Sequence, residues 1–400
     1  MPAITPGSTP ASMSELNRAR VVQYLYSNGV SSRAQIAKAL SLTPAAITKI
    51  TGKLIELGIV QETGDLTGKK NRRSIGLEVN ASDYLVIGVK FDRSNISIGL
   101  FDIGGTQLSH DELPSFGKTI IPQTLETVRR HVRKMLNAHP SVVAIGMTTP
   151  GPYLRPEGHT AKIASSEWWT TINFITEFSD AFDVPVFIEQ DARASAMAES
   201  LFDHTVTSKN MTYYLLGEGI GAGVIDHGEL VNGTMGAATE IGHISLNVDG
   251  EPCGCGNRGC LENYCSAIAF HRLINESKLI ESSENMTHEQ ACRAIFDLAR
   301  QNDENAMHLV RDLARYIGYG CVIIINAYNS EQIVLGGMLA EAGKPLLDEV
   351  TRIVRMRVIP EVMARTQIQL SALDTDPTLS GAAAVATAHF LEHPSAFQPN

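Results

Sequence analysis

Apolar residues near the start of the chain recur with the spacing of helices. Between residues 14 and 28 they fall on one helical face, and Gly29 follows as a C-cap. These positions are Leu16, Val21, Val22, Leu25 and Tyr26. A second helix is expected from Ser32, because Gln35 three residues later completes a capping box. A third is expected over residues 43–57, where a threonine N-cap precedes a proline. Three short helices with a tight last connection are typical of a helix-turn-helix.

Two strand-like segments, residues 59–62 and 73–79, follow these helices and predict a wing around the loop 63–72. In a winged helix-turn-helix the third helix enters the major groove, and a basic wing follows phosphate or a minor groove. The residues expected to contact DNA are Arg33, Ala45, Ala46, Thr48, Lys49, Lys53, Lys69, Lys70, Arg72 and Arg73. The alternative for each of them is an ordinary solvated helix or loop position.

The charge distribution supports a nucleic-acid partner at this end of the chain. Residues 1–79 hold ten Lys or Arg and five Asp or Glu, whereas the whole chain has a formal net charge of -10. A basic head on an acidic body indicates a polyanion such as double-stranded operator DNA as the partner of the head alone. The Pro/Ser/Thr-rich residues 1–13 predict a flexible tail.

The pattern changes from residue 84 onward to strands alternating with helices. Strands are expected at 84–91, 95–101, 106–114, 141–151, 184–191 and 332–338, with helices at 122–138, 305–327 and 380–390. A second half of the body begins near Met211 with the segment 213–228. This alternation predicts an α/β body. No apolar run reaches the roughly 20 residues that span a bilayer, and no secretory signal is visible. We therefore expect a cytoplasmic protein without membrane insertion.

Three cysteines and a histidine form the strongest local motif. His243, Cys253, Cys255 and Cys260 offer three thiols and one imidazole, the donor set of closed structural zinc sites. The alternative is that they are small buried residues of a Gly-rich loop, but three thiolates so close together would repel one another unless a cation neutralised them. The sequence therefore predicts a structural Zn²⁺ ion.

Three carboxylates are candidates for ligand binding. Glu240 and Glu262 flank the cysteine motif, and Asp191 ends a buried strand, where α/β proteins tend to place binding residues. Carboxylate oxygens accept hydrogen bonds from neighbouring hydroxyl groups, so a sugar is the natural candidate ligand. The alternative, solvated surface charge, is disfavoured for Glu240 and Glu262 by their proximity to the cysteine motif.

The segments EIGH at 240–243 and CGCGNRGCLE at 253–262 resemble the signature of the ROK family, which contains sugar kinases and sugar-responsive repressors. The winged helix-turn-helix resembles the repressor branch. The resemblance implies a two-lobed actin-like fold with sugar between the lobes, bound by Asp191, Glu240, His243 and Glu262. It implies that His243 binds zinc through one ring nitrogen and faces the sugar through the other. The chain has Gln190 where the family's kinases carry asparagine.

Together, the residue pattern and the resemblance predict four parts of the chain. The expected boundaries are 1–13 for the tail, 14–79 for the winged helix-turn-helix, 80–205 for the first lobe and 206–375 for the second lobe. A C-terminal helix at 376–392 should return to the first lobe.

The phosphate-binding motif of the family's kinases is the feature that this chain lacks. DIGGT at 102–106 matches it literally but lies one hairpin too late, and the expected turn falls on residues 90–94, where Lys90 replaces the magnesium-binding acid. Glu218 adds negative charge to the second glycine turn, 217–223. We therefore expect no enzyme activity. A retained ATP-dependent sugar kinase, or a repressor controlled by docking a sugar-transport protein, are the alternatives.

The overall expectation is a repressor of carbohydrate uptake or catabolism genes. It would act as a homodimer or homotetramer on a pseudo-palindromic operator, and a sugar or sugar-phosphate effector would shift its DNA-binding equilibrium.

Overall fold

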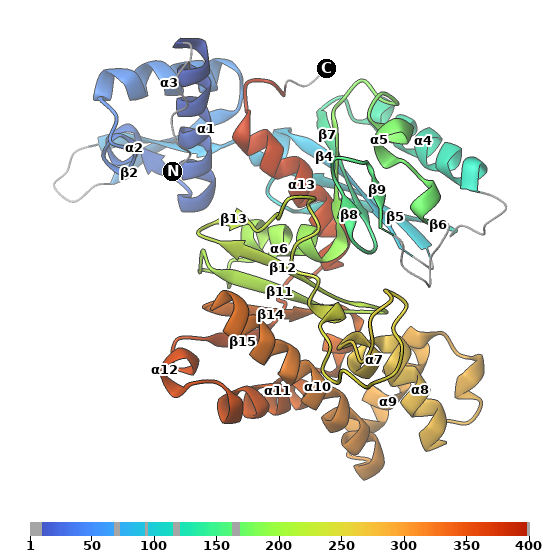
Figure 1. Cartoon of the computed structure of the whole chain (residues 1–400). Helices are drawn as coiled ribbons and strands as arrows, with labels where there is room; N and C mark the ends of the chain where they lie inside the picture. The colour runs from blue at the N-terminus through green and yellow to red at the C-terminus, as the bar shows by residue number, and fades with distance from the viewer. Residues whose placement is uncertain (1–9, 68–72, 93–94, 115–120, 162–168, 398–400) are drawn as a thin grey trace.

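The structure is a computed structural model, and it describes residues 10–67, 73–92, 95–114, 121–161 and 169–397. A small N-terminal head sits beside a larger body, and the body consists of two α/β lobes stacked on either side of a pair of helices (Figure 1). No helix among these residues combines the length and the apolar character needed to cross a bilayer.

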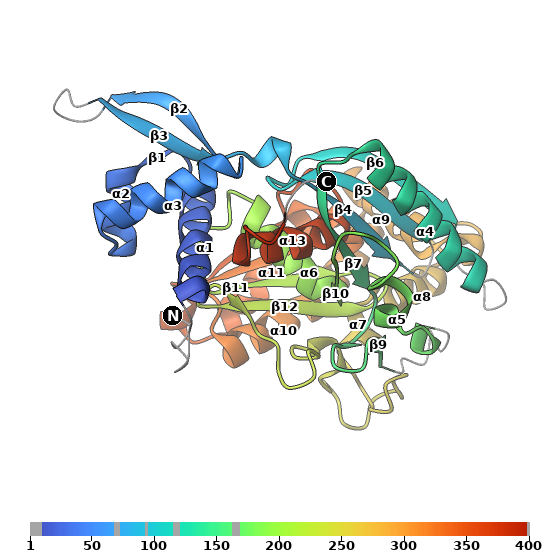
Figure 2. The same cartoon turned by 90° about the horizontal axis from the view of Figure 1, so that it is seen from above.

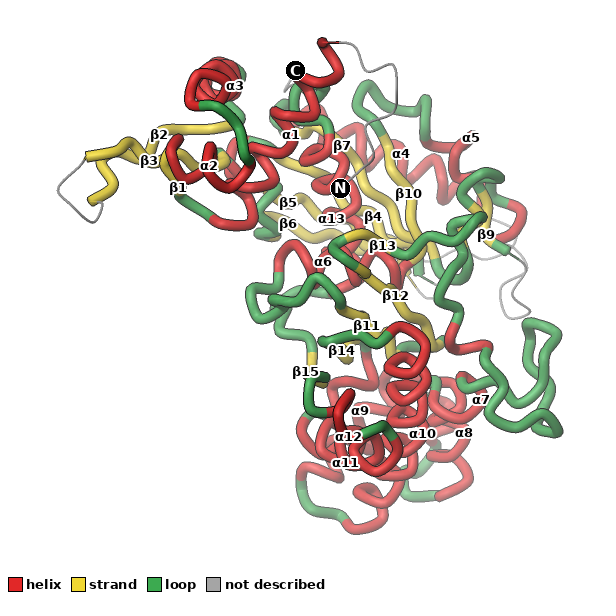
Figure 3. The backbone as a smooth tube through the Cα atoms, turned by 60° about the vertical axis from the view of Figure 1, so that its left-hand side comes forward, coloured by secondary structure: helices red, strands yellow, loops and turns green. Residues whose placement is uncertain are grey.

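The head is a winged helix-turn-helix. Its elements are α1 (Pro10–Asn28), β1 (Ser31–Ser32), α2 (Arg33–Leu40), α3 (Pro44–Glu56), β2 (Val60–Thr67) and β3 (Arg73–Val79), and the strands form a sheet in the order β1-β3-β2. The expected caps are present: Ser32 and Gln35 form the capping box of α2, and the Thr43 side chain accepts a hydrogen bond from the Ala46 backbone N–H. The wing strands point away from the body (Figures 2 and 3).

Two boundaries in the head differ from the sequence expectation. Helix α1 begins at Pro10, so residues 10–13 belong to a helix and not to a tail, because proline is well suited to a first helical turn. Residues 1–9 lie outside the described part of the chain. Strand β2 continues to Thr67, five residues beyond the predicted end, since its antiparallel pairing with β3 persists past a bulge near Glu62.

The first lobe is built on a five-stranded sheet in the order β10-β7-β4-β5-β6. Its elements are β4 (Leu85–Phe91), β5 (Asn95–Asp102), β6 (Gln107–Pro114), α4 (Ile121–Ala138), β7 (Val142–Thr149), β8 (Tyr153–Leu154), β9 (His159–Thr160), α5 (Phe174–Phe178) and β10 (Val186–Gln190). Strands β4, β7 and β10 are mutually parallel, so their carboxyl ends share one edge of the sheet. That edge is where α/β sheets place ligands.

The second lobe is built on a five-stranded sheet in the order β13-β12-β11-β14-β15. Its elements are β11 (Met211–Leu216), β12 (Ile220–Asp226), β13 (Glu229–Leu230), α7 (Glu262–Cys265), α8 (Ala267–Ser277), α9 (His288–Arg300), α10 (Glu304–Tyr328), β14 (Gln332–Gly336), α11 (Lys344–Arg357), α12 (Pro360–Met363) and β15 (Gln367–Leu370). Apolar residues of α8, α9, α10 and α11 share one buried cluster with those of β11 and β14.

Two helices, α6 (Asp191–Phe202) and α13 (Pro377–Glu392), lie side by side between the sheets (Figure 1). Helix α13 packs on β4, β7 and β10 of the first lobe, and α6 packs on β11 and β12 of the second. The C-terminal helix therefore returns to the first lobe, as the ROK resemblance implies.

Small residues allow α13 to lie against the first sheet at very short range. A Cβ atom at Gly146 of β7 would overlap the Ala382 carbonyl, and one at Gly88 of β4 would lie 3.0 Å from the Leu379 carbonyl oxygen. Residues 381–384 of α13 are glycine and alanines, and all are buried. Glycine in the strands and alanine in the helix are thus required by this approach.

The head is packed onto the first lobe through α13 and the β5–β6 hairpin. The Tyr26 hydroxyl donates to the Ile103 carbonyl at 2.7 Å, and the Tyr84 hydroxyl donates to the Leu57 carbonyl at 2.8 Å. The Tyr84 ring also contacts Phe390 of α13, with the ring centroids 5.0 Å apart. Buried residues of α1 and α13 belong to one apolar cluster, so head and first lobe share a core.

The close packing at Gly146 yields a stability prediction. We expect Gly146→Ala to lower the free energy of unfolding by about 3 kcal/mol, because the added methyl group must displace α13. Gly52→Ala is the matched control: no atom lies within 4 Å of a Cβ there, and alanine in a helix interior should stabilise by roughly 0.5–1 kcal/mol. Urea denaturation of both variants measures the difference. Equal stability of the two variants would contradict the packing argument.

Candidate ligand cleft and metal cluster

A cleft of about 750 Å³ separates the two lobes. Its walls come from the carboxyl ends of β4 and β10, the β11–β12 turn, the segment around η3 (Ile241–His243), and the start of α7, α9 and α13. The predicted ligand residues Asp191, Glu240, His243 and Glu262 all line it. Residues more than 70 positions apart in the chain are therefore brought to one space; their role in sugar binding stays a prediction.

The three carboxylates reach the cleft from different elements. Asp191 is the first residue of α6 directly after β10, Glu240 precedes η3, and Glu262 is the first residue of α7. Burial raises the pKa of Glu240 to about 8, and the nearby negative charges of Asp191 and Glu262 add to the effect. The carboxyl group of Glu240 is therefore largely protonated at neutral pH and can donate as well as accept a hydrogen bond.

Gln190 connects the first lobe to Glu240. Its Nε2 donates a hydrogen bond to Oε1 of Glu240 at 3.3 Å. The glutamine side chain is one methylene longer than the asparagine of the family's kinases. Its Oε1 is buried and has no hydrogen-bond partner among the described residues, although Gln190 lines the cleft. A buried acceptor without a donor is costly unless a ligand or water supplies one.

An ion pair buried beside the cleft holds β10 and α6 in place. Arg193 is fully buried, and its Nε donates to Oε1 of Glu189 at 3.0 Å. The same guanidinium donates to the Val231 carbonyl and to the Asn232 side chain, and Arg155 also pairs with Glu189. These residues are not among the predicted site residues, although the spacing of four between Glu189 and Arg193 is a sequence signal for such a pair.

The four predicted metal ligands converge. The side-chain donor atoms of His243, Cys253, Cys255 and Cys260 all lie within 4.8 Å of one another. Cys255 Sγ is 3.7 Å from Cys260 Sγ, and Cys253 Sγ is 3.8 Å from His243 Nδ1. A tetrahedron with bonds of about 2.3 Å has edges of about 3.8 Å, so the spacing fits a tetrahedral zinc ion. The cluster can hold a metal ion and is compatible with zinc.

The metal cluster adjoins the ligand cleft through Glu262. Its Oε1 lies 3.2 Å from Cys253 Sγ and 3.4 Å from His243 Nδ1. Since Nδ1 of His243 faces the thiols, Nε2 is the ring nitrogen left for another partner. An ion at the cluster would fix the orientation of His243, which also lines the cleft.

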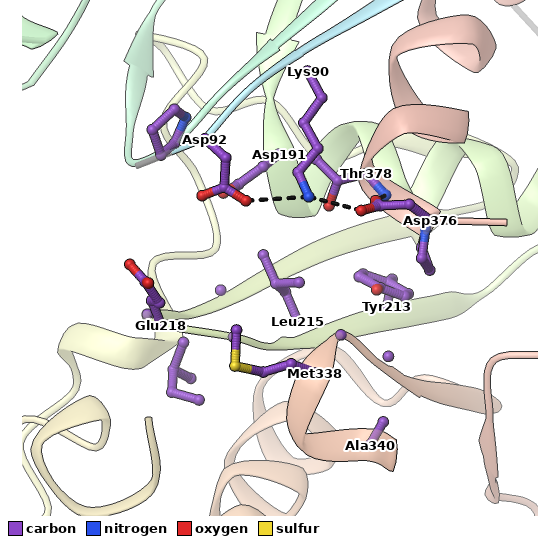
Figure 4. Close-up of a pocket in the computed structure, with 18 of the residues that line it drawn as sticks. Lys90, Asp92, Asp191, Tyr213, Leu215, Glu218, Met338, Ala340, Asp376 and Thr378 are labelled. Atoms are coloured by element: carbon purple, nitrogen blue, oxygen red, sulfur yellow. Dashed lines mark hydrogen bonds and ion pairs between the residues drawn. The ribbon is translucent and has the colours of Figure 1, made fainter. Parts of the chain in front are cut away.

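Lys90 occupies the end of β4, where the sequence predicts the missing phosphate turn. Its ammonium group lies 2.7 Å from Asp376 and 3.1 Å from Asp92 (Figure 4). Burial alone would lower the pKa of Lys90, but these two carboxylates outweigh it and raise the pKa. Asp376 also accepts from the backbone N–H groups of Thr378 and Leu379 at the start of α13.

The DIGGT segment lies elsewhere, as the sequence predicts. Residues 102–106 form the β5–β6 turn, where the Thr106 N–H donates to Oδ1 of Asp102 at 2.8 Å. None of these five residues lines the cleft. The glycine turn around Glu218 does line it, across from Lys90 and Asp92 (Figure 4).

The predicted DNA-contacting residues fall into four groups. Ala45, Thr48, Lys49 and Lys53 are exposed on α3, and Ala46 is partly exposed. Arg33 is held within the head, because it donates to Thr51 at 3.1 Å and to Glu62 at 2.9 Å. Arg73 begins β3. Lys69, Lys70 and Arg72 lie outside the described residues.

The winged-helix head, the two α/β lobes with a cleft between them and the cysteine motif are together typical of one family of proteins. Residues 86–389 match the ROK family, and the chain belongs to that family. The similarity extends over the head in regulators of the family. The chain is 29% identical over 373 residues to the DNA-binding transcriptional dual regulator NagC of Escherichia coli K12, covering 90% of this chain and 89% of that protein.

Other relatives include regulators and kinases. The xylose repressor of Bacillus spizizenii is 26% identical over 381 residues, covering 94% of this chain and 96% of that protein. The crystal structure of a ROK family transcriptional regulator, a homologue of the E. coli MLC protein, superposes with a TM-score of 0.79 at 25% identity and covers 95% of this chain and 97% of its own. A ROK family glucokinase from Streptomyces griseus, in complex with glucose and AMPPNP, has a TM-score of 0.64 at 26% identity and covers 76% of this chain and 99% of its own.

Helix α6, which begins with Asp191, also carries a buried acid, Glu199. Glu199 is fully buried, and its Oε1 accepts from the Ser371 hydroxyl at 2.5 Å. Burial, reinforced by the neighbouring Asp203, raises the pKa of Glu199 from 4.5 to about 8. In the unfolded chain this group loses its proton near pH 4.5, so the stability that it contributes falls as the pH rises from there through about 8.

We therefore expect Glu199→Gln to unfold with a weaker pH dependence than the parent protein. Between about pH 5 and pH 8.5 the variant should gain stability relative to the parent by on the order of 1–3 kcal/mol, because an amide needs no proton to stay neutral. Urea denaturation across this range measures it, with the exposed Glu229→Gln as control. Parallel pH profiles of Glu199→Gln and the parent would refute the shift.

Proposed function

We propose that the protein is a sugar-responsive transcription regulator that represses genes of carbohydrate uptake or catabolism. The observation that carries the proposal is the shared core of the winged-helix head and α13, the helix that begins in the cleft. A ligand that changes the position of the lobes thereby acts on the element that supports the DNA-binding head. The regulators among the relatives support this function.

The head binds double-stranded operator DNA through α3. Ala45, Ala46, Thr48 and Lys49 meet base edges in the major groove, and Lys53 with the basic wing residues Lys69, Lys70, Arg72 and Arg73 contacts the backbone. Arg33 is tied to Glu62 and Thr51, so it acts mainly by fixing α2 against α3. A homodimer or homotetramer supplies two heads for a pseudo-palindromic site in the cytoplasm.

The cleft binds the sugar through Asp191, Glu240, His243 and Glu262. The carboxylate oxygens of the three acids and a ring nitrogen of His243 form hydrogen bonds with the ring hydroxyls, and the lobes close around the ligand. A zinc ion held by His243, Cys253, Cys255 and Cys260 is structural: four protein ligands leave no open position for catalysis, and the ion orders the loop that carries Glu262.

The same cleft does not transfer phosphate. A metal–nucleotide complex needs a carboxylate that is free to bind the metal ion. At the end of β4 the ammonium group of Lys90 lies between Asp92 and Asp376 and pairs with both of them. Glu218 adds a further negative charge on the opposite side of the cleft (Figure 4). Kinases are among the structural neighbours. A direct test is incubation of the purified protein with ATP, magnesium and a hexose, for which we expect no phosphorylated product.

Asp191→Asn tests the sugar site. We expect it to weaken binding of the active sugar by at least about tenfold, because the neutral amide accepts more weakly and places a donor against hydroxyl groups. Operator affinity without sugar should stay within about twofold, since Asp191 lines the cleft and is not part of the apolar cluster that joins the head to the first lobe. Calorimetry gives the first quantity, and fluorescence anisotropy with an operator fragment obtained by in vitro selection gives the second.

The exposed Asp180→Asn, in the same lobe, serves as the matched control and should change neither quantity. Operator affinity of the parent should also fall steeply with salt, because phosphate contacts release counterions. Retention of the full sugar response by Asp191→Asn, or salt-independent DNA binding, would sink the proposed function.

Metal analysis tests the cysteine cluster. We expect about one zinc ion per chain in freshly purified protein, and a loss of zinc in Cys255→Ser, because a tetrahedral site needs its fourth ligand. Cys292→Ala is the control, since Cys292 is buried in the second lobe apart from the cluster and should leave the zinc content intact. Parent protein without zinc by mass spectrometry under native conditions would contradict the assignment.

A further inference from the structure

We propose that the cleft selects an uncharged sugar and rejects the phosphorylated form of the same sugar; this inference rests on the proposed function. The geometry that points to it is the charge of the residues lining the cleft. Among the described residues, nine acids line it: Asp92, Glu112, Asp191, Glu218, Glu240, Glu262, Glu289, Glu341 and Asp376. The lysines and arginines that line it within the same residues are Lys90 and Arg293.

Both of these cations are already neutralised by the protein. Lys90 lies between Asp376 and Asp92, and its side chain is only 15% exposed. Arg293 binds Glu341 through two parallel hydrogen bonds of 2.8 Å and pairs with Glu289 at 2.7 Å. A phosphate group would have to compete with carboxylates for either cation. A cation whose charge and N–H donors are already used by two carboxylates is a poor binding site for an additional anion.

The excess of negative charge survives generous assumptions about protonation. Glu240 carries a proton at neutral pH, and the histidines that line the cleft are His110, His243 and His288. Without Glu240, eight acids that line the cleft still face only two lysine or arginine side chains among the described residues. A phosphate monoester brings nearly two negative charges at pH 7, and charges of one sign in a cleft with protein walls repel strongly.

The hydrogen-bonding groups of the cleft point to the same class of ligand. Its carboxylates are acceptors, and Gln190 adds a buried amide oxygen that has no donor among the described residues. Hydroxyl groups supply donors, whereas a dianionic phosphate supplies only acceptors. A neutral polyol satisfies this lining, and a phosphate would leave acceptors facing acceptors.

The consequence concerns the place of the effector in metabolism. A regulator with this preference responds to sugar that enters or is released in free form, by transport without modification or by glycoside hydrolysis. The reaction that removes the signal is then phosphorylation of the sugar, because the product no longer binds.

The test compares free and phosphorylated ligands on the intact protein. Calorimetric titration is performed with a panel of free hexoses, pentoses and N-acetylhexosamines and with the corresponding 6- or 5-phosphates. We expect the best free sugar to bind at least about tenfold more tightly than its phosphate. A phosphate ester that binds as tightly as its free sugar, or more tightly, overturns the inference and leaves the proposed function standing. If no compound of either kind binds, the proposed function falls and the inference falls with it.

A charge variant separates electrostatic rejection from steric exclusion. In the double variant Asp92→Asn/Glu218→Gln, affinity for the phosphate should rise several-fold while affinity for the free sugar changes less than about twofold, because neither residue is among the proposed sugar contacts. Glu361→Gln, exposed on α12 and outside the cleft, is the control and should leave the ratio of the two affinities unchanged.

A second measurement does not depend on the variant folding. Raising the salt concentration should reduce the preference of the parent protein for the free sugar, since salt screens repulsion between charges. A preference that stays constant both across salt and in the double variant would show that shape excludes the phosphate, and would overturn the electrostatic argument.

Discussion

The rest of the architecture depends on the close approach of α13 to the first sheet. Glycines in β4 and β7 and alanines in α13 bring backbone within contact distance of backbone, so the helix has one position only. The same helix starts in the cleft at Asp376 and ends against α1 of the head. The candidate ligand cleft and the DNA-binding head are thus connected by one helix, α13, and not by a flexible linker.

The candidate metal ligands and three residues that line the cleft belong to one segment of the chain, residues 240–262. The segment from Glu240 to Glu262 has little regular secondary structure, and such a segment cannot hold carboxylates in register by backbone pairing alone. An ion held by the four candidate ligands would cross-link the segment in place of that pairing. Glu240 and Glu262, which line the cleft, flank these candidate ligands along the chain.

Much of this organisation could be predicted from the sequence, because its signals are local. Capping boxes, proline at a first helical position and the cysteine spacing each act within a few residues, so the head, the α/β class and the metal cluster were predicted. The start of α1 and the length of the wing strand were wrong, since both depend on continued pairing or packing. The bond from Lys90 to Asp376 joins residues 286 positions apart, and no local pattern contains it. Only the fold shows that the Asp-Pro cap of α13 meets the end of β4.

The Lys90 ion pair gives the regulator a property that a bound cation could not. A magnesium ion exchanges with the surrounding pool, so a site built on it changes its charge with the metal and nucleotide content of the cell. The ammonium group of Lys90 belongs to the chain and is present at fixed stoichiometry. Under the proposed function, the sensing of carbohydrate therefore does not depend on the magnesium and nucleotide content of the cell.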